Sequence, residues 1–115
     1  MLSKKNRLAN RKDFAAVFRN GEKFGWNGLF SLAKKNTLKD SRFGFVVSSK
    51  ISSKAVTRNK IKRRMRNIVE HKLAKIKSGF DFIFIAQKGL ENSTFEEMAE
   101  CFDKIFKKLK LEKDA

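Results

Sequence analysis

The sequence predicts an α+β fold, a small two-layer sandwich in which helices pack against a sheet. Two observations lead to this prediction: long stretches with apolar residues at three- and four-residue spacing, and short strand-like stretches between them, in the order α-β-β-β-α-β-α. The 115 residues include no proline and no low-complexity linker, so we expect one domain spanning residues 1–115. With 41% hydrophobic residues and 12 phenylalanines, the core should be rich in phenylalanine.

The first predicted element is a short helix at residues 11–19. Asn10 suits the N-cap position, and Asp13 lies in the first turn, where the positive end of the helix dipole favours an acid. Phe14 and Phe18 are one helical turn apart and therefore share a face. From this spacing alone, the simpler interpretation is that both phenylalanines belong to the core.

Strands are expected on both sides of a central helix. The stretch "GEKFGWNGLFSLAKK" predicts a short strand, a turn and a longer strand near 28–35, and "SRFGFVVSSK" predicts a strand at 42–48. The stretch "GFDFIFIAQK" predicts a strand at 80–86 whose apolar residues fall on both faces, which is typical of a central strand.

The longest predicted helix spans residues 54–77, between the strands at 42–48 and 80–86. Its apolar residues recur at three- and four-residue spacing: Ile61, Met65, Ile68, Val69, Leu73 and Ile76. The two strands and this helix are therefore expected to form a βαβ unit, for which the general rule is a right-handed crossover.

The last predicted element is an amphipathic helix that opens with the capping-box pattern "STFE", from Ser93 to Glu96. Acids come early in this helix and lysines late, which suits the helix dipole. Cys101 falls on its apolar side, so we expect it to fill the core. His71, on the preceding helix, is expected to be a surface residue.

The charge is strongly positive and unevenly distributed. Lys and Arg number 28 against 12 acids, for a formal net charge of +16. Residues 1–90 hold 23 basic and 5 acidic side chains, whereas residues 91–115 hold 5 basic and 7 acidic ones. Self-repulsion on this scale is usually tolerated because a polyanion is the natural partner, so nucleic acid is the leading candidate.

A membrane surface is the other polyanion to consider. No stretch approaches the roughly 18 apolar residues of a spanning helix, and the N-terminus "MLSKKNRLANRK" lacks the apolar segment of a signal peptide. We therefore expect no membrane partner and a cytoplasmic location. The single cysteine allows no internal disulfide and offers no metal cluster, in keeping with a reducing compartment.

The segment "AVTRNKIKRRMRN", residues 55–67, holds six basic side chains, two asparagines and no acid. With successive residues roughly 100° apart around a helix, most of its polar side chains lie outside the apolar stripe. The candidates for nucleic-acid binding are Arg58, Asn59, Lys60, Lys62, Arg63, Arg64 and Arg66. A charge run is often only a solvated face, but like charges at this spacing destabilise a helix unless a partner neutralises them, which favours phosphate binding.

Residues that could carry chemistry are sparse. Glu22, Asp40 and Asp81 are scattered in the sequence, and no Ser/His/Asp or Cys/His arrangement is present. We therefore expect neither a catalytic group nor a metal site in the protein itself.

Three segments resemble a known family. The segment "AVTRNKIKRRMR" resembles the RNR signature of the protein subunit of bacterial ribonuclease P. The segment "NRLANRKDFAAVFRNG" is similar to that family's N-terminal run, and "RFGFVVSSKISSKAV" resembles the strand and loop that lead into the signature. The resemblance covers the chain almost end to end.

The resemblance implies a small protein that binds a large catalytic RNA and helps it to remove the 5′ leader of precursor tRNA. The chain would be the accessory subunit of an endoribonuclease whose catalytic groups lie in the RNA. Its partners would be ribonuclease P RNA and precursor tRNA, with no obligate protein partner, and Mg²⁺ would be bound mainly by the RNA. The resemblance also implies a left-handed βαβ crossover, against the general rule.

At the level of residues, the resemblance assigns an RNA-holding role to the signature positions Arg58, Asn59, Lys60, Lys62, Arg63 and Arg66, with Arg64 as an additional basic residue. It also implies a cleft between the first helix and the sheet that receives the single-stranded leader. The candidates for this cleft are Phe14, Phe18, Ser48 and Lys50, and either Phe30 or Ser31 takes a further position. Exposed aromatic rings can stack on bases without reading a sequence.

Two other functions remain open. A basic ribosomal protein would share the size and the charge but would need no leader cleft. A general nucleic-acid-binding protein, such as one that compacts DNA, should bind duplex DNA at least as well as folded RNA. A stand-alone protein nuclease disagrees with the missing carboxylate cluster.

Overall fold

Four strands form one sheet in the order β1-β2-β4-β3 in the computed structural model, which describes residues 2–111. The strands are β1 (Glu22–Trp26), β2 (Leu29–Lys35), β3 (Arg42–Val46) and β4 (Phe80–Ala86). β2 pairs antiparallel with β1 and with β4, whereas β3 pairs parallel with β4. β4 therefore has a neighbour on each side, which confirms the prediction of a central strand.

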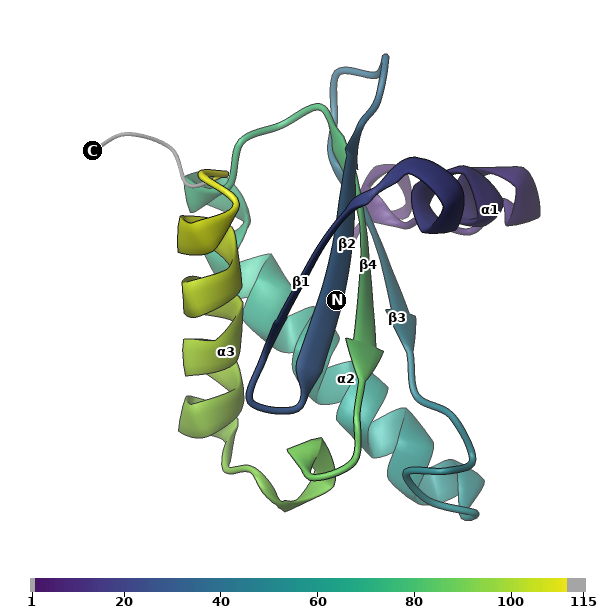
Figure 1. Ribbon diagram of the computed structural model, residues 1–115, viewed down its shortest axis with the longest axis vertical. Helices are drawn as coiled ribbons and strands as arrows, with labels where there is room; N and C mark the ends of the chain where they lie inside the picture. Colours follow the sequence, from purple (N-terminus) through teal and green to yellow (C-terminus); the bar gives the residue numbers. More distant parts are fainter. Residues whose placement is uncertain (1, 112–115) are drawn as a thin grey trace.

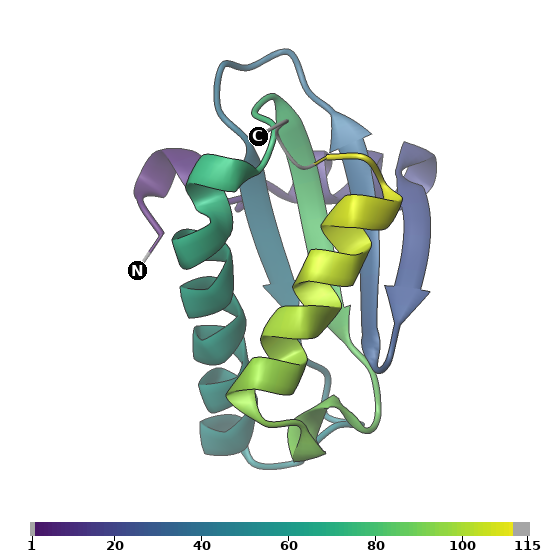
Figure 2. The same ribbon diagram turned by 90° about the vertical axis from the view of Figure 1, so that its left-hand side faces the viewer.

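The sheet lies between helices that cover its two faces unequally. α2 (Ala55–Lys72) and α3 (Phe95–Lys108) lie on one face, and α1 (Arg11–Asn20) crosses the opposite face (Figures 1 and 2). The predicted α+β class and element order are confirmed. The sheet and the α2–α3 pair form the two main layers, and α1 adds partial cover on the other side. Within residues 2–111, no helix is both long and apolar enough to cross a membrane.

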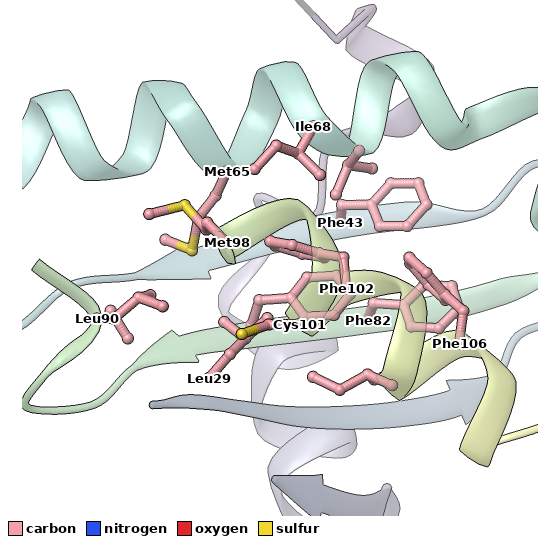
Figure 3. Packing of buried hydrophobic residues seen from close by; sticks show 14 of the residues in the cluster. Leu29, Phe43, Met65, Ile68, Phe82, Leu90, Met98, Cys101, Phe102 and Phe106 are labelled. Atoms are coloured by element: carbon pink, nitrogen blue, oxygen red, sulfur yellow. The ribbon is translucent and has the colours of Figure 1, made fainter. Parts of the chain in front are cut away.

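Phenylalanine rings fill the space between the sheet and the α2–α3 layer, as the composition predicts (Figure 3). The rings of Phe43 and Phe82, from neighbouring strands, stack with centroids 5.0 Å apart. Phe102 of α3 lies 4.7 Å from Phe84, and Phe106 meets Phe82 edge-on at 5.5 Å. These large buried side chains hold α3 against β4, at about 1.5–3 kcal/mol for each fully buried ring.

The crossover from β3 through α2 to β4 is left-handed. Figure 2 views the sheet from the side of α2 and α3: the teal-blue β3 and the green β4 both point downward, α2 lies in front, and β4 lies to the right of β3. A right-handed crossover would place β4 to the left of β3 in this view. The handedness implied by the family resemblance is therefore confirmed, and the general rule does not hold here.

The basic helix ends earlier than predicted. Instead of reaching residue 77, α2 stops at Lys72, and a 3₁₀ turn (Leu73–Lys75) follows. Ile76 is still buried, but its backbone is extended, with φ −102° and ψ 137°. The apolar spacing continues past the end of the helix because the returning chain must also bury its side chains on the way to β4.

The last helix begins one residue later than predicted. The capping box is formed by Thr94 and Glu97: the Thr94 hydroxyl accepts from the Glu97 N–H at 3.1 Å, and the Glu97 carboxylate accepts from the Thr94 N–H at 2.8 Å. The predicted pair, Ser93 with Glu96, and the observed pair, Thr94 with Glu97, both fit the capping-box pattern. Ser93 is not the cap because its backbone N–H already donates to the Leu90 carbonyl at 3.0 Å, which closes the preceding 3₁₀ turn.

A tight hairpin joins β1 to β2 at the edge of the sheet. Asn27 and Gly28 form its tip with φ of 44° and 90°, left-handed values that Asn and Gly tolerate well. The adjacent Trp26 is 39% exposed, and the Lys104 ammonium of α3 lies 5.8 Å from the centroid of its ring. The hairpin tip therefore lies beside α3.

We predict that Thr94→Ala lowers the free energy of unfolding by about 0.5–2 kcal/mol, because two backbone donors lose their capping arrangement. Urea unfolding of the purified protein measures this loss. Ser93→Ala is the matched control, since the Ser93 hydroxyl makes no hydrogen bond within residues 2–111, and it should stay within about 0.5 kcal/mol of the parent. The reverse ranking of the two variants would contradict the observed cap.

Candidate nucleic-acid interface

The solvent face of α2 carries most of the predicted nucleic-acid-binding residues. The exposed ones are Asn59, Lys60, Arg63 and Arg66, and the half-buried ones are Arg58, Lys62 and Arg64. Four apolar residues of the same helix are buried against the sheet and α3: Ile61, Met65, Ile68 and Val69. Because this apolar stripe fixes the rotation of the helix about its axis, the basic side chains point outward together.

Within residues 2–111, no acid is paired with this basic face. The ion pairs within residues 2–111 join Arg42 to Asp13 and Asp81, and Lys72 to Asp103. None of them involves the seven candidate residues of α2. The first turn of α2 contains no acid, and no side chain caps its N-terminus. Such an array of positive charges destabilises an isolated helix and complements the negative charge of a phosphate backbone.

Arg58 differs from the other basic residues because it also supports the loop before α2. Its Nη1 donates to the Ser52 carbonyl at 2.9 Å. Earlier in the same loop, the Ile51 N–H donates to the Ser48 carbonyl at 3.1 Å, which closes a turn. Ser48 and Lys50 are both exposed in this turn. Arg58 thus ties α2 to the loop residue that follows this turn, while leaving other guanidinium donors for a ligand.

The opposite face of the sheet shows three rows of side chains, each running across β2, β4 and β3. The strand pairing puts Lys34, Asp81 and Arg42 in the first row, Leu32, Ile83 and Gly44 in the second, and Phe30, Ile85 and Val46 in the third. α1 packs on the middle row: its Val17 is fully buried in a small cluster with Leu32 and Ile83. A charged row therefore lies on one side of α1 and an apolar row on the other.

Phe14 lies directly on the middle row. A Cβ placed on Gly44 would overlap the ring of Phe14, so the ring can rest on the sheet only because this position is a glycine. Phe14 is half-buried there, whereas Phe18, one turn later, is 45% exposed. The two phenylalanines are therefore not simple core residues, although the spacing alone favours that interpretation.

The apolar row beside α1 is only partly covered. Phe30, Val46 and Ile85 are half-buried, and they pack against the small cluster beneath α1. Ser31 points to the other face, where it is fully buried and its hydroxyl donates to the Phe24 carbonyl at 2.8 Å. Of the two open choices, Phe30 is the residue that shares a face with Phe14.

The family resemblance implies a cleft on this side of the sheet, and we therefore use the name aromatic cleft for the surface formed by Phe14, Phe18, Phe30, Val46 and Ile85. Sequence reasoning identified the two phenylalanines of α1 but missed Val46 and Ile85. The alternation of β3 and β4 assigns these two residues to one face, yet it does not reveal which face α1 leaves open. The exposed turn with Ser48 and Lys50 follows Val46 along the chain, at the end of the sheet where the apolar row lies.

The charged row is joined to α1 by Arg42. Its Nε and Nη2 donate to the two carboxylate oxygens of Asp81 at 2.9 and 2.7 Å, and its Nη1 donates to Asp13 of α1 at 3.0 Å. The hydrogen bonds to Asp81 are the main cause that raises the pKa of Arg42, so the guanidinium stays charged. Asp13 and Asp81, which are far apart in the sequence, thus both bind the guanidinium of Arg42. Within residues 2–111, no group of three or more His, Cys, Asp or Glu side chains is arranged to hold a metal ion.

The cysteine and the histidine lie where the sequence predicts them. Cys101 is buried, and this burial raises the pKa of its thiol. His71 is exposed, and its Nδ1 lies 2.7 Å from the Asn67 carbonyl oxygen. Neither residue belongs to the basic face or to the aromatic cleft.

Comparison with known proteins gives a consistent result. The family model for ribonuclease P matches residues 2–110. The ribonuclease P protein component of Syntrophomonas wolfei is 35% identical over 108 residues, which cover 94% of this chain and 90% of the relative. That of Streptococcus pneumoniae is 38% identical over 96 residues, 83% of this chain and 77% of the relative.

Solved structures agree with this result. A mutant RNase P protein of Staphylococcus aureus superposes with a TM-score of 0.86 at 26% identity, covering 94% of this chain and 91% of that one. The RNase P protein of Thermotoga maritima gives a TM-score of 0.81 at 33% identity, with 89% and 96% covered.

The contact between Gly44 and Phe14 can be tested directly. We predict that Gly44→Ala lowers the free energy of unfolding by about 1–3 kcal/mol, because the added methyl group forces the Phe14 ring off the sheet. In a Phe14→Ala background the same substitution should cost less, giving a coupling of about 0.5 kcal/mol or more. Urea unfolding of the two single variants and the double variant measures the coupling. Additive losses would contradict the contact.

Proposed function

The chain belongs to the family of bacterial ribonuclease P protein components, and from this premise we propose that its two surfaces bind two RNAs. In this proposal the basic face of α2 binds the RNA subunit of ribonuclease P, and the aromatic cleft receives the 5′ leader of precursor tRNA. Family membership makes the protein a component of a ribonuclease that processes tRNA, and it favours this function over a ribosomal or general nucleic-acid-binding protein.

The observation that carries the proposal is the unneutralised basic face of α2. Its guanidinium groups can bind phosphate oxygens in pairs, and its ammonium groups add charge at intervals along the helix. None of the seven candidate residues has an acidic partner within residues 2–111. A folded RNA supplies phosphates at high density, so binding relieves the repulsion within the helix and releases counterions from the RNA.

The aromatic cleft has the features of a single-strand site. Rings that are partly exposed on a rigid support can stack on unpaired bases of any sequence. Phe14 rests on Gly44, Phe30 is part of β2, and Phe18 projects from α1 with 45% of its surface exposed. The leader of precursor tRNA is a single strand whose sequence varies, which is the kind of ligand such a surface accepts.

We propose that the chemistry itself belongs to the RNA subunit. The described part of the chain holds no group of three or more His, Cys, Asp or Glu side chains placed to bind a metal ion, so the proposal assigns no magnesium site to these residues. The ions would be bound mainly by RNA, and the contribution of the protein would be to bind and orient the two RNAs. Processing of tRNA in a bacterium is also consistent with the expected cytoplasmic location.

For the basic face, we predict that the triple variant Lys62→Ala, Arg63→Ala and Arg66→Ala binds ribonuclease P RNA more weakly. The slope of log K against log salt should fall by about one unit per lost phosphate contact. Filter binding at four or five salt concentrations measures this slope. Folding stability should not fall, because the variant removes repelling charges from an exposed helix face.

The matched control is Lys104→Ala, Lys107→Ala and Lys108→Ala, which removes the same charge from exposed positions of α3. This variant should keep most of the affinity and most of the salt slope. If both triple variants lose the same slope, binding depends on net charge alone and the assignment to α2 is wrong.

For the aromatic cleft, we predict that Phe18→Ala weakens binding of precursor tRNA to the reconstituted holoenzyme by about 1–3 kcal/mol, the value of one lost stack. Mature tRNA has no leader, so its affinity should not change. Because the Phe18 side chain is 45% exposed, its truncation should cost little stability. Binding of both RNAs and a thermal melt of the free protein are the measurements.

Phe95→Ala is the control for this experiment. Phe95 is 41% exposed, close to the value for Phe18, but it lies at the start of α3 on the other face of the sheet. The control should bind both RNAs like the parent protein. Equal losses of affinity for precursor and mature tRNA in the Phe18 variant would contradict the assignment of the leader to the aromatic cleft.

A further inference from the structure

α1 is attached to the sheet in two ways. Its Val17 is buried with Leu8, Leu32 and Ile83 in a small apolar cluster. The second attachment is polar: the Asp13 carboxylate accepts a hydrogen bond from Arg42 at 3.0 Å. Within residues 2–111, this is the one hydrogen bond or ion pair between a side chain of α1 and a strand. The apolar contacts of Val17 and Phe14 seat α1 on the sheet, and the polar contact adds a directional restraint on the rotation of α1 about its own axis.

Contacts within the sheet orient Arg42 independently of α1. Two of its donors bind both oxygens of Asp81, whose side chain is only 9% exposed. Asp81 also accepts from the Asn36 amide at 2.8 Å. The third donor group of Arg42 is left pointing at α1, where it meets Asp13. The guanidinium fork is thus held by the sheet and presents a fixed hydrogen-bond donor to the helix.

The positions of Asp13 and Phe18 make this contact relevant to the aromatic cleft. With about 100° per residue, the two side chains lie roughly 140° apart around the helix, and Val17 and Phe14 lie between them. Asp13 therefore stands on the side of the charged row, and Phe18 on the side of the apolar row. Rotation of α1 about the buried Val17 would move Asp13 away from Arg42 and change the distance between Phe18 and the sheet.

We propose that Asp13 is a positioning residue for the single-stranded leader: through Arg42 it restrains the rotation of α1, together with the apolar contacts of Val17 and Phe14, and so sets the distance of Phe18 from the apolar row. This inference rests on the proposed function of the cleft. Asp13 touches no leader nucleotide in this arrangement. Its effect is on the fraction of molecules whose cleft is ready to bind, and the apparent affinity for the leader falls in proportion to that fraction.

The test is the ratio of precursor to mature tRNA affinity in the reconstituted holoenzyme. Asp13→Asn keeps the shape of the side chain but removes the charge, and it leaves Asp81 paired with Arg42. We expect it to weaken precursor binding roughly three- to ten-fold, the range of a charge-assisted hydrogen bond in a partly exposed position. Mature tRNA binding and the melting temperature should stay near the parent values, and Asp13→Glu should restore part of the ratio.

Asp103→Asn is the matched control, because Asp103 is paired with Lys72 at 2.6 Å between α3 and α2, away from the cleft. It should leave the ratio unchanged. An unchanged ratio in Asp13→Asn, together with a changed ratio in Phe18→Ala, would overturn this inference alone. Unchanged ratios in both variants would overturn the leader site itself and the inference with it. A loss for both RNAs and a large fall in melting temperature would make Asp13 a structural residue only.

Discussion

The whole structure depends on one constraint: the central strand β4 is apolar on both faces. Phe82 and Phe84 point to one face and Ile83 and Ile85 to the other, so both faces of the sheet need cover. The chain supplies two long helices for the first face but only the short α1 for the second. One row of that face therefore remains half-covered. A partly exposed apolar surface of this kind is available to bind a ligand.

Much of the fold could be predicted because it follows from short-range patterns. The continuous apolar run identified β4, the cap and first-turn residues identified α1, and the helical spacing identified α2. Asn10 was predicted as the cap of α1, where its side chain accepts from the Lys12 N–H at 2.8 Å. The start of α3 was wrong by one residue, since Ser93 and Thr94 both fit the same motif. The handedness of the crossover does not follow from local pattern at all; only the resemblance to a family indicated it.

The candidate site was predictable to the extent that it lies on one element. The basic face of α2 is continuous in the sequence, and the structure shows it on one exposed side. The aromatic cleft is assembled from α1 and three strands, so no local sequence pattern marked Val46 and Ile85 as part of it. The same is true of the contact between Asp13 and Arg42, which are 29 positions apart. Residues that act through pairing across a sheet become visible only when the strand register is known.

The hairpin tip at Trp26 has a practical consequence for solution studies. Trp26 is the only tryptophan and the chain has no tyrosine, so the intrinsic fluorescence excited at 295 nm comes from this one ring. The ring sits beside Lys104 at the β1 edge, and its pairing with Leu29 puts it on the α3 side of the sheet, whereas the aromatic cleft lies on the other face. Its emission therefore reports the closure of the hairpin against α3 and carries no contribution from stacking in the cleft. The molecule contains its own optical probe of folding, spatially separate from the surfaces assigned to RNA.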